Sequence, residues 1–375
     1  MVRILHCADL HLEISFARLG LPAGIGSNLR SELRSTLGSI LSEARRLQVD
    51  AVTIAGDLYE QATALPETAR FLIQQFERMG STPVLIAPGK QDPYGANSLY
   101  ALTRWPSNVH MFSSPDFEPL TLASTITVWG AACPTAAQEA WRQQITRQPN
   151  STNVMLAHAV IAPETDPSIF TVSESALPAA NVAVALLGGS HQPQIPHPSG
   201  RIVFPGSPQP LDWSDPSTPR GAVLVSIQDG RFTAEQIQLR SWRFADLAVR
   251  LEQCHTAEDV AKRVEREFAN LNTQGSLTVV AQVTLYGASD GDFTLAEVRA
   301  ALVPEVNVVL NRPFAFPYDL DQLSQEQTVR GTLVRRVREQ LDASSDATAR
   351  TDLLAALKTA LLAVEGRQVH PDAIG

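Results

Sequence analysis

The stretch Ile86-Ala87-Pro88-Gly89-Lys90-Gln91-Asp92-Pro93 joins an apolar run to a polar loop. Three similar junctions occur elsewhere, and each places an Asp or a His just past a run with β-strand character: Ala8-Asp9-Leu10-His11, Gly56-Asp57 and Leu156-Ala157-His158. Functional side chains gather at strand ends because the sheet is rigid while its loops are free to vary. We therefore expect these junctions to converge on one functional site.

The first ninety residues alternate between strand and helix periodicity. Strands are expected at residues 2–8, 51–55 and 83–87, and helices at residues 31–47 and 66–79. This βαβαβ order indicates parallel strands, helices on the faces of the sheet, and a site at the carboxyl ends of the strands.

The middle of the chain is richer in β-type runs, and Asp229-Gly230 between two of them is a hairpin turn signal. The predicted fold class is α/β (α+β), a two-layer β-sandwich flanked by helices over residues 1–240. A small α+β capping module is expected at 241–317, ending in a Pro-rich link at 312–317. A C-terminal helical segment should follow at 318–375, with helices at 324–341 and 348–365 that each carry an apolar stripe.

Composition excludes several classes of protein. A formal net charge of −9 over 375 residues argues against a nucleic-acid surface along the whole chain, although it allows a local basic patch. No apolar run approaches the roughly 20 residues that span a bilayer, and the N-terminus leads directly into a strand, so a cytoplasmic protein without a membrane partner is expected. Cys7, Cys133 and Cys254 form no C-x-x-C pair and are expected to be buried fillers.

The junctions form an ordered set of metal-ligand candidates: Asp9-x-His11, Gly56-Asp57, Gly89-Lys90-Gln91-Asp92, His158 and Gly188-Gly189-Ser190-His191. Two neighbouring divalent ions need a bridging carboxylate surrounded by imidazoles and oxygens, which this set could supply. The set resembles the calcineurin-like metallophosphoesterases, whose pattern is D-x-H, G-D-x-x-(D), G-N-H-(D/E), H and G-H-x-H.

Longer strings resemble one branch of that family, the DNA-repair exonucleases of the SbcD/Mre11 type and their YhaO-like relatives. The resemblance covers residues 1–240 well and the rest by layout alone. Its strings are Ile4-Leu5-His6-Cys7-Ala8-Asp9-Leu10-His11-Leu12, Gly56-Asp57-Leu58-Tyr59, Asp92-Pro93-Tyr94, Trp105-Pro106-Ser107-Asn108-Val109 and Phe204-Pro205-Gly206-Ser207-Pro208-Gln209-Pro210.

The resemblance implies one complete metal site and one degenerate site. The first would use Asp9, His11, Asp57 and His191. The second would share Asp57 and include His158, but Lys90 and Gly189 stand where the family has an Asn and a His, and Gln91 stands at the general-acid position, next to Asp92. A protonated lysine has no acceptor atom for a cation, so Lys90 either replaces the second ion electrostatically or reflects drift. A lost general acid typically costs ~10² to 10⁴ in rate.

The resemblance therefore implies a metal-dependent hydrolase, a nuclease in DNA repair that cleaves DNA phosphodiesters through a metal-activated water. One divalent ion is expected, Mn²⁺ first. Two alternatives stay open: a catalytically inactive scaffold that engages DNA or an SMC-like ATPase of the SbcC/Rad50 type through the C-terminal helices, and a phosphoesterase for small substrates. A homodimer is also possible. Structural or surface roles are expected for the remaining histidines: His6, His110, His197, His255 and His370.

Overall fold

The structure, a computed structural model, divides the chain into two compact units, Met1–Phe244 and Ala245–Gly375. It describes residues 1–21, 23–123, 125–132, 141–146, 151–161, 170–196, 200–215, 218–271, 278–286, 293–311, 320–343 and 347–364. The expected Pro-rich link at 312–317 lies outside these residues. The predicted domain boundaries at 240 and 317 stay predictions.

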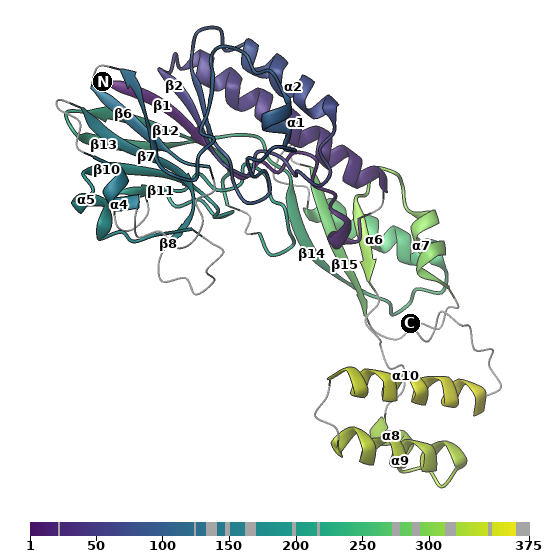
Figure 1. Ribbon diagram of the computed structural model, residues 1–375. Coiled ribbons are helices and arrows are strands. Elements are labelled where there is room, and N and C mark those ends of the chain that lie inside the picture. Colours follow the sequence, from purple (N-terminus) through teal and green to yellow (C-terminus); the bar gives the residue numbers. More distant parts are fainter. Residues whose placement is uncertain are drawn as a thin grey trace. The chain divides into compact units, whose positions relative to one another are not determined.

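The first unit contains a mixed sheet in the order β13-β12-β1-β2-β3-β4. The neighbours from β1 to β4 are parallel, whereas β12 runs antiparallel to both β1 and β13. Helices α1 (Ala23–Arg46) and α2 (Pro66–Glu77) form the crossovers, as the βαβαβ pattern predicts, and Figure 1 shows them side by side. The strands are β1 (Val2–Cys7), β2 (Ala51–Ala55), β3 (Val84–Ala87), β4 (Val109–Met111), β12 (Gly221–Gln228) and β13 (Arg231–Gln238).

A second sheet has the order β11-β10-β7-β6-β5. Its strands are β5 (Glu118–Ala123), β6 (Ile126–Gly130), β7 (Thr152–His158), β10 (Val182–Gly188) and β11 (Ile202–Val203). One core cluster joins the two sheets, because it contains Ile4 and Val225 from the first sheet and Val128, Leu156 and Leu186 from the second. The predicted two-layer sandwich is confirmed.

The outer face of the second sheet has its own core, in which Trp141 and Leu177 are fully buried. Short elements cover it that the sequence periodicity did not predict, because they span only two to four residues. They are β8 (Val160–Ile161), β9 (Thr171–Val172), α4 (Trp141–Gln144) and α5 (Ala176–Ala179). Helix α1 also begins eight residues before the predicted start at residue 31, since Gly24 and Gly26 weaken the helical signal.

The second unit contains a small α+β arrangement with the sheet order β14-β15-β16. Val260 and Val264 of helix α6 pack against this sheet in a single core with Val283. The elements are β14 (Arg243–Arg250), α6 (Ala257–Leu271), β15 (Val279–Tyr286), α7 (Leu295–Ala301) and β16 (Val308–Asn311).

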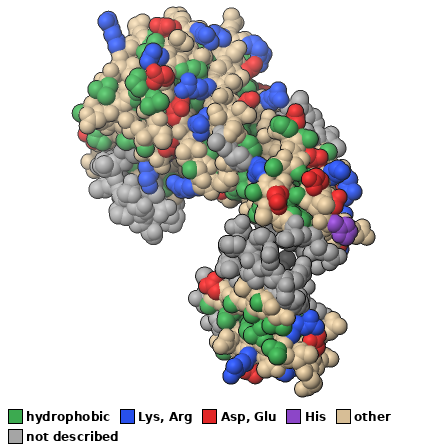
Figure 2. Space-filling model, turned by 90° about the vertical axis from the view of Figure 1, so that its right-hand side faces the viewer, with side chains coloured by type: hydrophobic (Ala, Val, Ile, Leu, Met, Phe, Trp, Pro, Cys, Tyr) green, Lys and Arg blue, Asp and Glu red, His purple; other side chains and the backbone are tan. Residues whose placement is uncertain are grey.

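Three helices follow: α8 (Leu320–Ser324), α9 (Val329–Ala343) and α10 (Ala347–Val364). The predicted single helix at 324–341 is wrong, because the hydroxyl of Thr328 accepts a hydrogen bond from the Gly331 backbone N–H at 3.1 Å and so begins α9. A core of four buried side chains holds the three helices together: Leu323, Val334, Leu357 and Leu361. Figure 2 shows hydrophobic side chains at the surface of this helical part.

Cys7 and Cys254 are buried, as expected, and Cys133 lies outside the described residues. None of the helices in the described residues is both long enough and apolar enough to cross a membrane.

Candidate metal centre

The candidate residues lie where the carboxyl ends of parallel strands from both sheets meet. Asp9 and Asp57 follow β1 and β2, His158 ends β7, and His191 follows β10. Asp9, His11 and Asp57 have φ values of 52°, 47° and 49°, in the left-handed region that residues other than glycine rarely adopt. Such strain typically costs about 1–3 kcal/mol per residue and clusters at functional sites.

Backbone hydrogen bonds hold this strained geometry. The Asp9 N–H donates to the Gly56 carbonyl at 3.1 Å, and the His11 N–H donates to the Asp57 carbonyl at 2.8 Å. The loops after β1 and β2 are therefore tied together before any side chain is considered.

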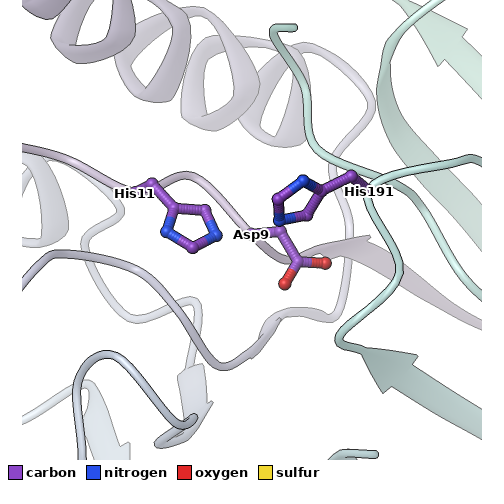
Figure 3. A group of neighbouring side chains, drawn as sticks. All are labelled: Asp9, His11 and His191. Atoms are coloured by element: carbon purple, nitrogen blue, oxygen red, sulfur yellow. The ribbon is translucent and has the colours of Figure 1, made fainter. Parts of the chain in front are cut away.

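Asp9, His11 and His191 form one group of possible metal ligands, with ligand atoms within 4.8 Å of one another. Figure 3 shows both imidazole rings beside the Asp9 carboxylate, and the ring centroids are 5.2 Å apart. His11 Nε2 also lies 3.6 Å from Asp57 Oδ2. Three of the four residues predicted for the first metal site thus form one ligand group, whereas the fourth, Asp57, lies outside this group and contacts it through His11.

Asp9, Asp57 and His158 form a second group within the same distance. His158 Nε2 lies 3.5 Å from Asp57 Oδ2, and His158 Nδ1 lies 3.8 Å from Asp9 Oδ1. The same oxygen of Asp57, Oδ2, therefore lies near two histidine Nε2 atoms, those of His11 and His158. A carboxylate in this position can bind a cation next to either histidine.

The Nδ1 atoms of His11 and His158 each have a hydrogen-bond acceptor. His11 Nδ1 donates to Glu60 Oε1 at 2.7 Å, and His158 Nδ1 donates to the Ala55 carbonyl at 3.1 Å. Both bonds fix the tautomer that leaves the Nε2 lone pair available to a metal. Glu60 was not among the predicted site residues, although its place three residues after Asp57 matches the last position of G-D-x-x-(D).

The buried side chains of this site fit a divalent cation. His11 Nε2 is buried and has no hydrogen-bond partner among the described residues. Burial and the neighbouring Asp57 raise the pKa of Asp9, which is fully buried. Burial lowers the pKa of His11, but the hydrogen bond to Glu60 and the charges of Asp57, Asp9 and Glu60 together raise it. Carboxylate and imidazole donors around an unpaired nitrogen are a suitable ligand set for a borderline or hard cation.

Lys90 and Gln91, the two altered positions after β3, are exposed. Within the described part of the chain, the Lys90 ammonium makes no ion pair within 4.0 Å, with Asp57 or with any other acid. Gln91 contacts Asp57 through its backbone, because its N–H donates to Asp57 Oδ1 at 2.8 Å.

Gly189, the third altered position, contributes a backbone group. Its N–H lies 3.1 Å from both carboxylate oxygens of Asp9, and its φ is +100°. A Cβ atom at this position would lie 3.3 Å from His158 Nε2 and 3.0 Å from the Ala159 carbonyl oxygen. The glycine therefore orients Asp9 and keeps the space next to His158 Nε2 open.

Asp92 links the ends of β2 and β3. It is fully buried, and its Oδ1 accepts from the backbone N–H groups of Asp57 and Gly89 at 2.9 and 2.6 Å. Its Oδ2 accepts from the Leu58 N–H at 2.8 Å and from the Tyr100 hydroxyl at 2.6 Å. Burial and the charge of Asp57 raise the pKa of Asp92. This carboxylate is a structural acceptor that positions Asp57.

The loop that carries His191 rests on a buried arginine that the sequence did not single out. Arg220 is 1% exposed and donates through Nη1 to the carbonyls of His191 at 2.9 Å and Ser207 at 2.8 Å. Arg220 therefore joins this loop to the Gly206-Ser207-Pro208 turn. His191 Nδ1 lies 4.0 Å from Asp215 Oδ1, which gives the third histidine an acidic neighbour as well.

Three other histidines in the described residues lie outside both ligand groups: His6, His110 and His255. His6 is fully buried and bonds Thr53 Oγ1 at 3.0 Å, as expected for a structural histidine. His197 and His370 lie outside the described residues.

Comparison with known proteins gives one family match and several weaker likenesses. The family model for calcineurin-like phosphoesterases matches residues 2–193, which include every member of both ligand groups. The chain is 24% identical over 300 residues to the uncharacterized metallophosphoesterase YhaO of Bacillus subtilis (strain 168), a match that covers 76% of this chain and 72% of that protein.

Solved structures are also similar to the chain at low sequence identity, and two of them serve as examples. TT1561 of Thermus thermophilus is 13% identical, with a TM-score of 0.38, and the match covers 63% of this chain and 98% of that one. A dimetal phosphatase from Danio rerio is 11% identical, with a TM-score of 0.40 and coverage of 62% and 95%.

Proposed function

The chain belongs to the calcineurin-like phosphoesterase family, and from this premise we propose that it hydrolyses phosphodiester bonds in DNA with a divalent cation. The observation that carries the proposal is that one oxygen of the Asp57 carboxylate lies 3.6 Å from His11 Nε2 and 3.5 Å from His158 Nε2. Both histidines have their Nδ1 atoms bonded to an acceptor, so both present lone pairs toward the same buried carboxylate.

The proposed ion is Mn²⁺, held by Asp9, His11, Asp57 and His191. Among the described residues, a second ion would find Asp9, Asp57 and His158 as side-chain ligands, so we propose that it binds more weakly. When bound, a divalent ion would polarise the phosphoryl group and lower the pKa of water. The protein's contribution is to orient the carboxylates, through the Gly189 N–H on Asp9 and the Gln91 N–H on Asp57.

The exposed amide of Gln91 cannot donate a proton as an acid does. We propose that turnover is slow for substrates whose leaving group needs a proton. The rate should be lower by the factor of ~10² to 10⁴ that a general acid typically supplies. An activated diester such as bis(4-nitrophenyl) phosphate, whose leaving group is stable as an anion, should escape most of this loss. A large preference for the activated diester over DNA is therefore expected.

The test is a nuclease assay on purified protein with linear duplex DNA in Mn²⁺, beside hydrolysis of bis(4-nitrophenyl) phosphate. Asp57→Asn should abolish both activities, because it removes the carboxylate charge that lies next to both His11 Nε2 and His158 Nε2. Activity that survives Asp57→Asn would refute the site. Metal analysis adds a second measure: about one ion per chain fits, whereas two ions contradict the weak second position.

The exposed Lys90 and Gln91 favour one alternative, an inactive scaffold that engages DNA or an SMC-like ATPase through the C-terminal helices. Val329 of α9 is 74% exposed and Val364 of α10 is 49% exposed, so apolar surface is present on the helices proposed for this contact. A wild-type protein that shows no hydrolytic activity and binds no metal would favour the scaffold. The cytoplasmic location and a homodimer stay predictions.

A further inference from the structure

The loop after β3, residues 89–97, is fixed at the site by buried polar groups. Asp92 accepts the Gly89 N–H at 2.6 Å, and Ser98 Oγ accepts the Gly95 N–H at 3.2 Å. The Gln61 N–H donates to the Gln91 carbonyl at 2.9 Å. We call this segment the rim loop. Its anchors point inward, whereas Lys90, Gln91, Pro93 and Tyr94 are exposed.

Lys90 lies close to the ligand groups although its side chain is in solvent. The Gln91 nitrogen is 2.8 Å from Asp57 Oδ1, and a Cα atom lies about 2.4 Å from the next backbone nitrogen. The Lys90 Cα is therefore within roughly 5 Å of the Asp57 carboxylate. An extended lysine spans about 6 Å from Cα to Nζ, so the ammonium can reach an anion held over the site.

Tyr94 is the exposed aromatic residue of the same loop, at 40% relative exposure. Within the described part of the chain, its ring has no aromatic or cation contact and its hydroxyl has no hydrogen bond. The Tyr94 ring is therefore a partly exposed aromatic surface four residues from Lys90 in the anchored rim loop. Aromatic rings on such platforms bind nucleic acids by stacking on bases, while nearby ammonium groups contact the phosphates.

We propose that the rim loop is a binding subsite for a single nucleic-acid strand, with Lys90 on a phosphate and Tyr94 stacked on a base. This inference rests on the proposed function, because it assigns the substrate class of the same site. A small phosphoester offers nothing for Tyr94 to stack on, so the tyrosine would discriminate nucleic acid from other phosphoesters. It also gives Lys90 a role that requires exposure, unlike the replacement of a buried ion.

The test measures binding separately from turnover. A fluorescein-labelled ten-nucleotide single strand is titrated with the full chain in Ca²⁺ and followed by anisotropy, with a gel to verify that the strand stays intact. Lys90→Gln should raise Kd about tenfold and reduce the slope of log Kd against log salt by roughly 0.7, the value for one lost phosphate contact on a single strand. Lys262→Gln, at an exposed lysine of α6, is the matched control and should change neither quantity.

Tyr94→Ala should raise Kd about tenfold without altering the salt slope, because stacking carries no net charge. Tyr94→Phe keeps the ring and should bind like the wild type. Thermal unfolding of each variant verifies folding, and the Mn²⁺ affinity should be unchanged in all of them. Wild-type Kd values for both Lys90→Gln and Tyr94→Ala would overturn the proposal.

The outcomes also separate this inference from the proposed function. A wild-type protein that cleaves bis(4-nitrophenyl) phosphate in Mn²⁺ but does not bind the strand would refute the rim subsite and leave a phosphoesterase. A protein that binds the strand through Lys90 and Tyr94 but neither binds Mn²⁺ nor hydrolyses the diester would refute the catalytic proposal alone.

Discussion

Glu60→Leu should weaken the binding of Mn²⁺ without unfolding the protein. Glu60 Oε1 accepts the only hydrogen bond that His11 makes through its ring in the described residues, at 2.7 Å from Nδ1. Loss of such an outer partner typically reduces metal affinity about 10- to 100-fold, or about 1.4–2.7 kcal/mol. Glu60→Gln keeps an acceptor oxygen, so its loss should be smaller than that of Glu60→Leu.

Isothermal titration of Mn²⁺ into EDTA-treated, dialysed protein measures this effect directly. Glu67→Gln is a suitable control, because Glu67 is paired with Arg70 on the exposed side of α2. A wild-type Kd in Glu60→Leu would refute the view that Glu60 positions His11. A loss as large in Glu67→Gln would show that the effect is not specific to the site.

The pH dependence gives an independent readout. The pKa of His11 is raised because the hydrogen bond to Glu60 and the nearby carboxylates outweigh the lowering effect of burial. Since a metal needs the neutral imidazole, Mn²⁺ affinity should rise as pH rises through this elevated pKa. Glu60→Gln removes one of the charges that raise the pKa, so the rise in affinity should move to lower pH. An unchanged pH profile would exclude a coupling between the two side chains.

Three further changes test the surroundings of the site. Gly189→Ala should destabilise the protein by about 1–3 kcal/mol in chemical denaturation, because φ is +100° and the new Cβ would lie 3.3 Å from His158 Nε2. Gly95→Ala is the control: its Cβ would meet nothing within 4 Å, so the substitution should be nearly neutral. Asp92→Asn leaves at least one backbone N–H without an acceptor oxygen and should cost about 1–3 kcal/mol by the same assay. Unchanged stability would contradict the role of Asp92 as an acceptor. Burial lowers the pKa of His6 from 6.5 to about 4, so the unfolded chain binds the proton at a higher pH than the folded protein does. As pH falls from 6.5 to 4, the free energy of unfolding of the wild type should therefore decrease by up to about 3 kcal/mol relative to that of His6→Gln. If the unfolding free energies of the wild type and of His6→Gln change equally with pH, His6 does not have this lowered pKa.

The sequence was informative where one residue type has one structural consequence. Continuous apolar runs locate β1 to β3, and a period of 3.6 locates α2, within two residues of their observed bounds, because these strands are buried on both faces and the helix on one. Asp9 and Asp57 could be predicted as neighbours because they follow adjacent parallel strands, β1 and β2, whose ends lie at the same edge. His158 and His191 come from the second sheet, and only the family resemblance assigned them to a metal site with these two residues.

Contacts between particular side chains could not be predicted from these sequence patterns. The hydrogen bond of His11 depends on the direction in which the Glu60 carboxylate points. The separation of the two residues along the chain does not reveal this direction. The orientation of Lys90 is a similar case. A positive residue at a ligand position has one meaning if its side chain is buried and another if it is exposed, and the side chain is exposed here.

Gly189 illustrates why a missing ligand in a motif does not by itself remove a metal position. The change suggested by the family pattern is to restore a histidine there, together with Lys90→Asn and Gln91→His. The backbone at 189 has a φ of +100°, however, and a Cβ would lie 3.3 Å from His158 Nε2, so Gly189→His would strain the loop and crowd the existing ligand. The N–H of Gly189 also orients both oxygens of Asp9, at 3.1 Å each. This local geometry is adapted to glycine, so the triple reversion should restore a second metal position less well than Lys90→Asn with Gln91→His alone.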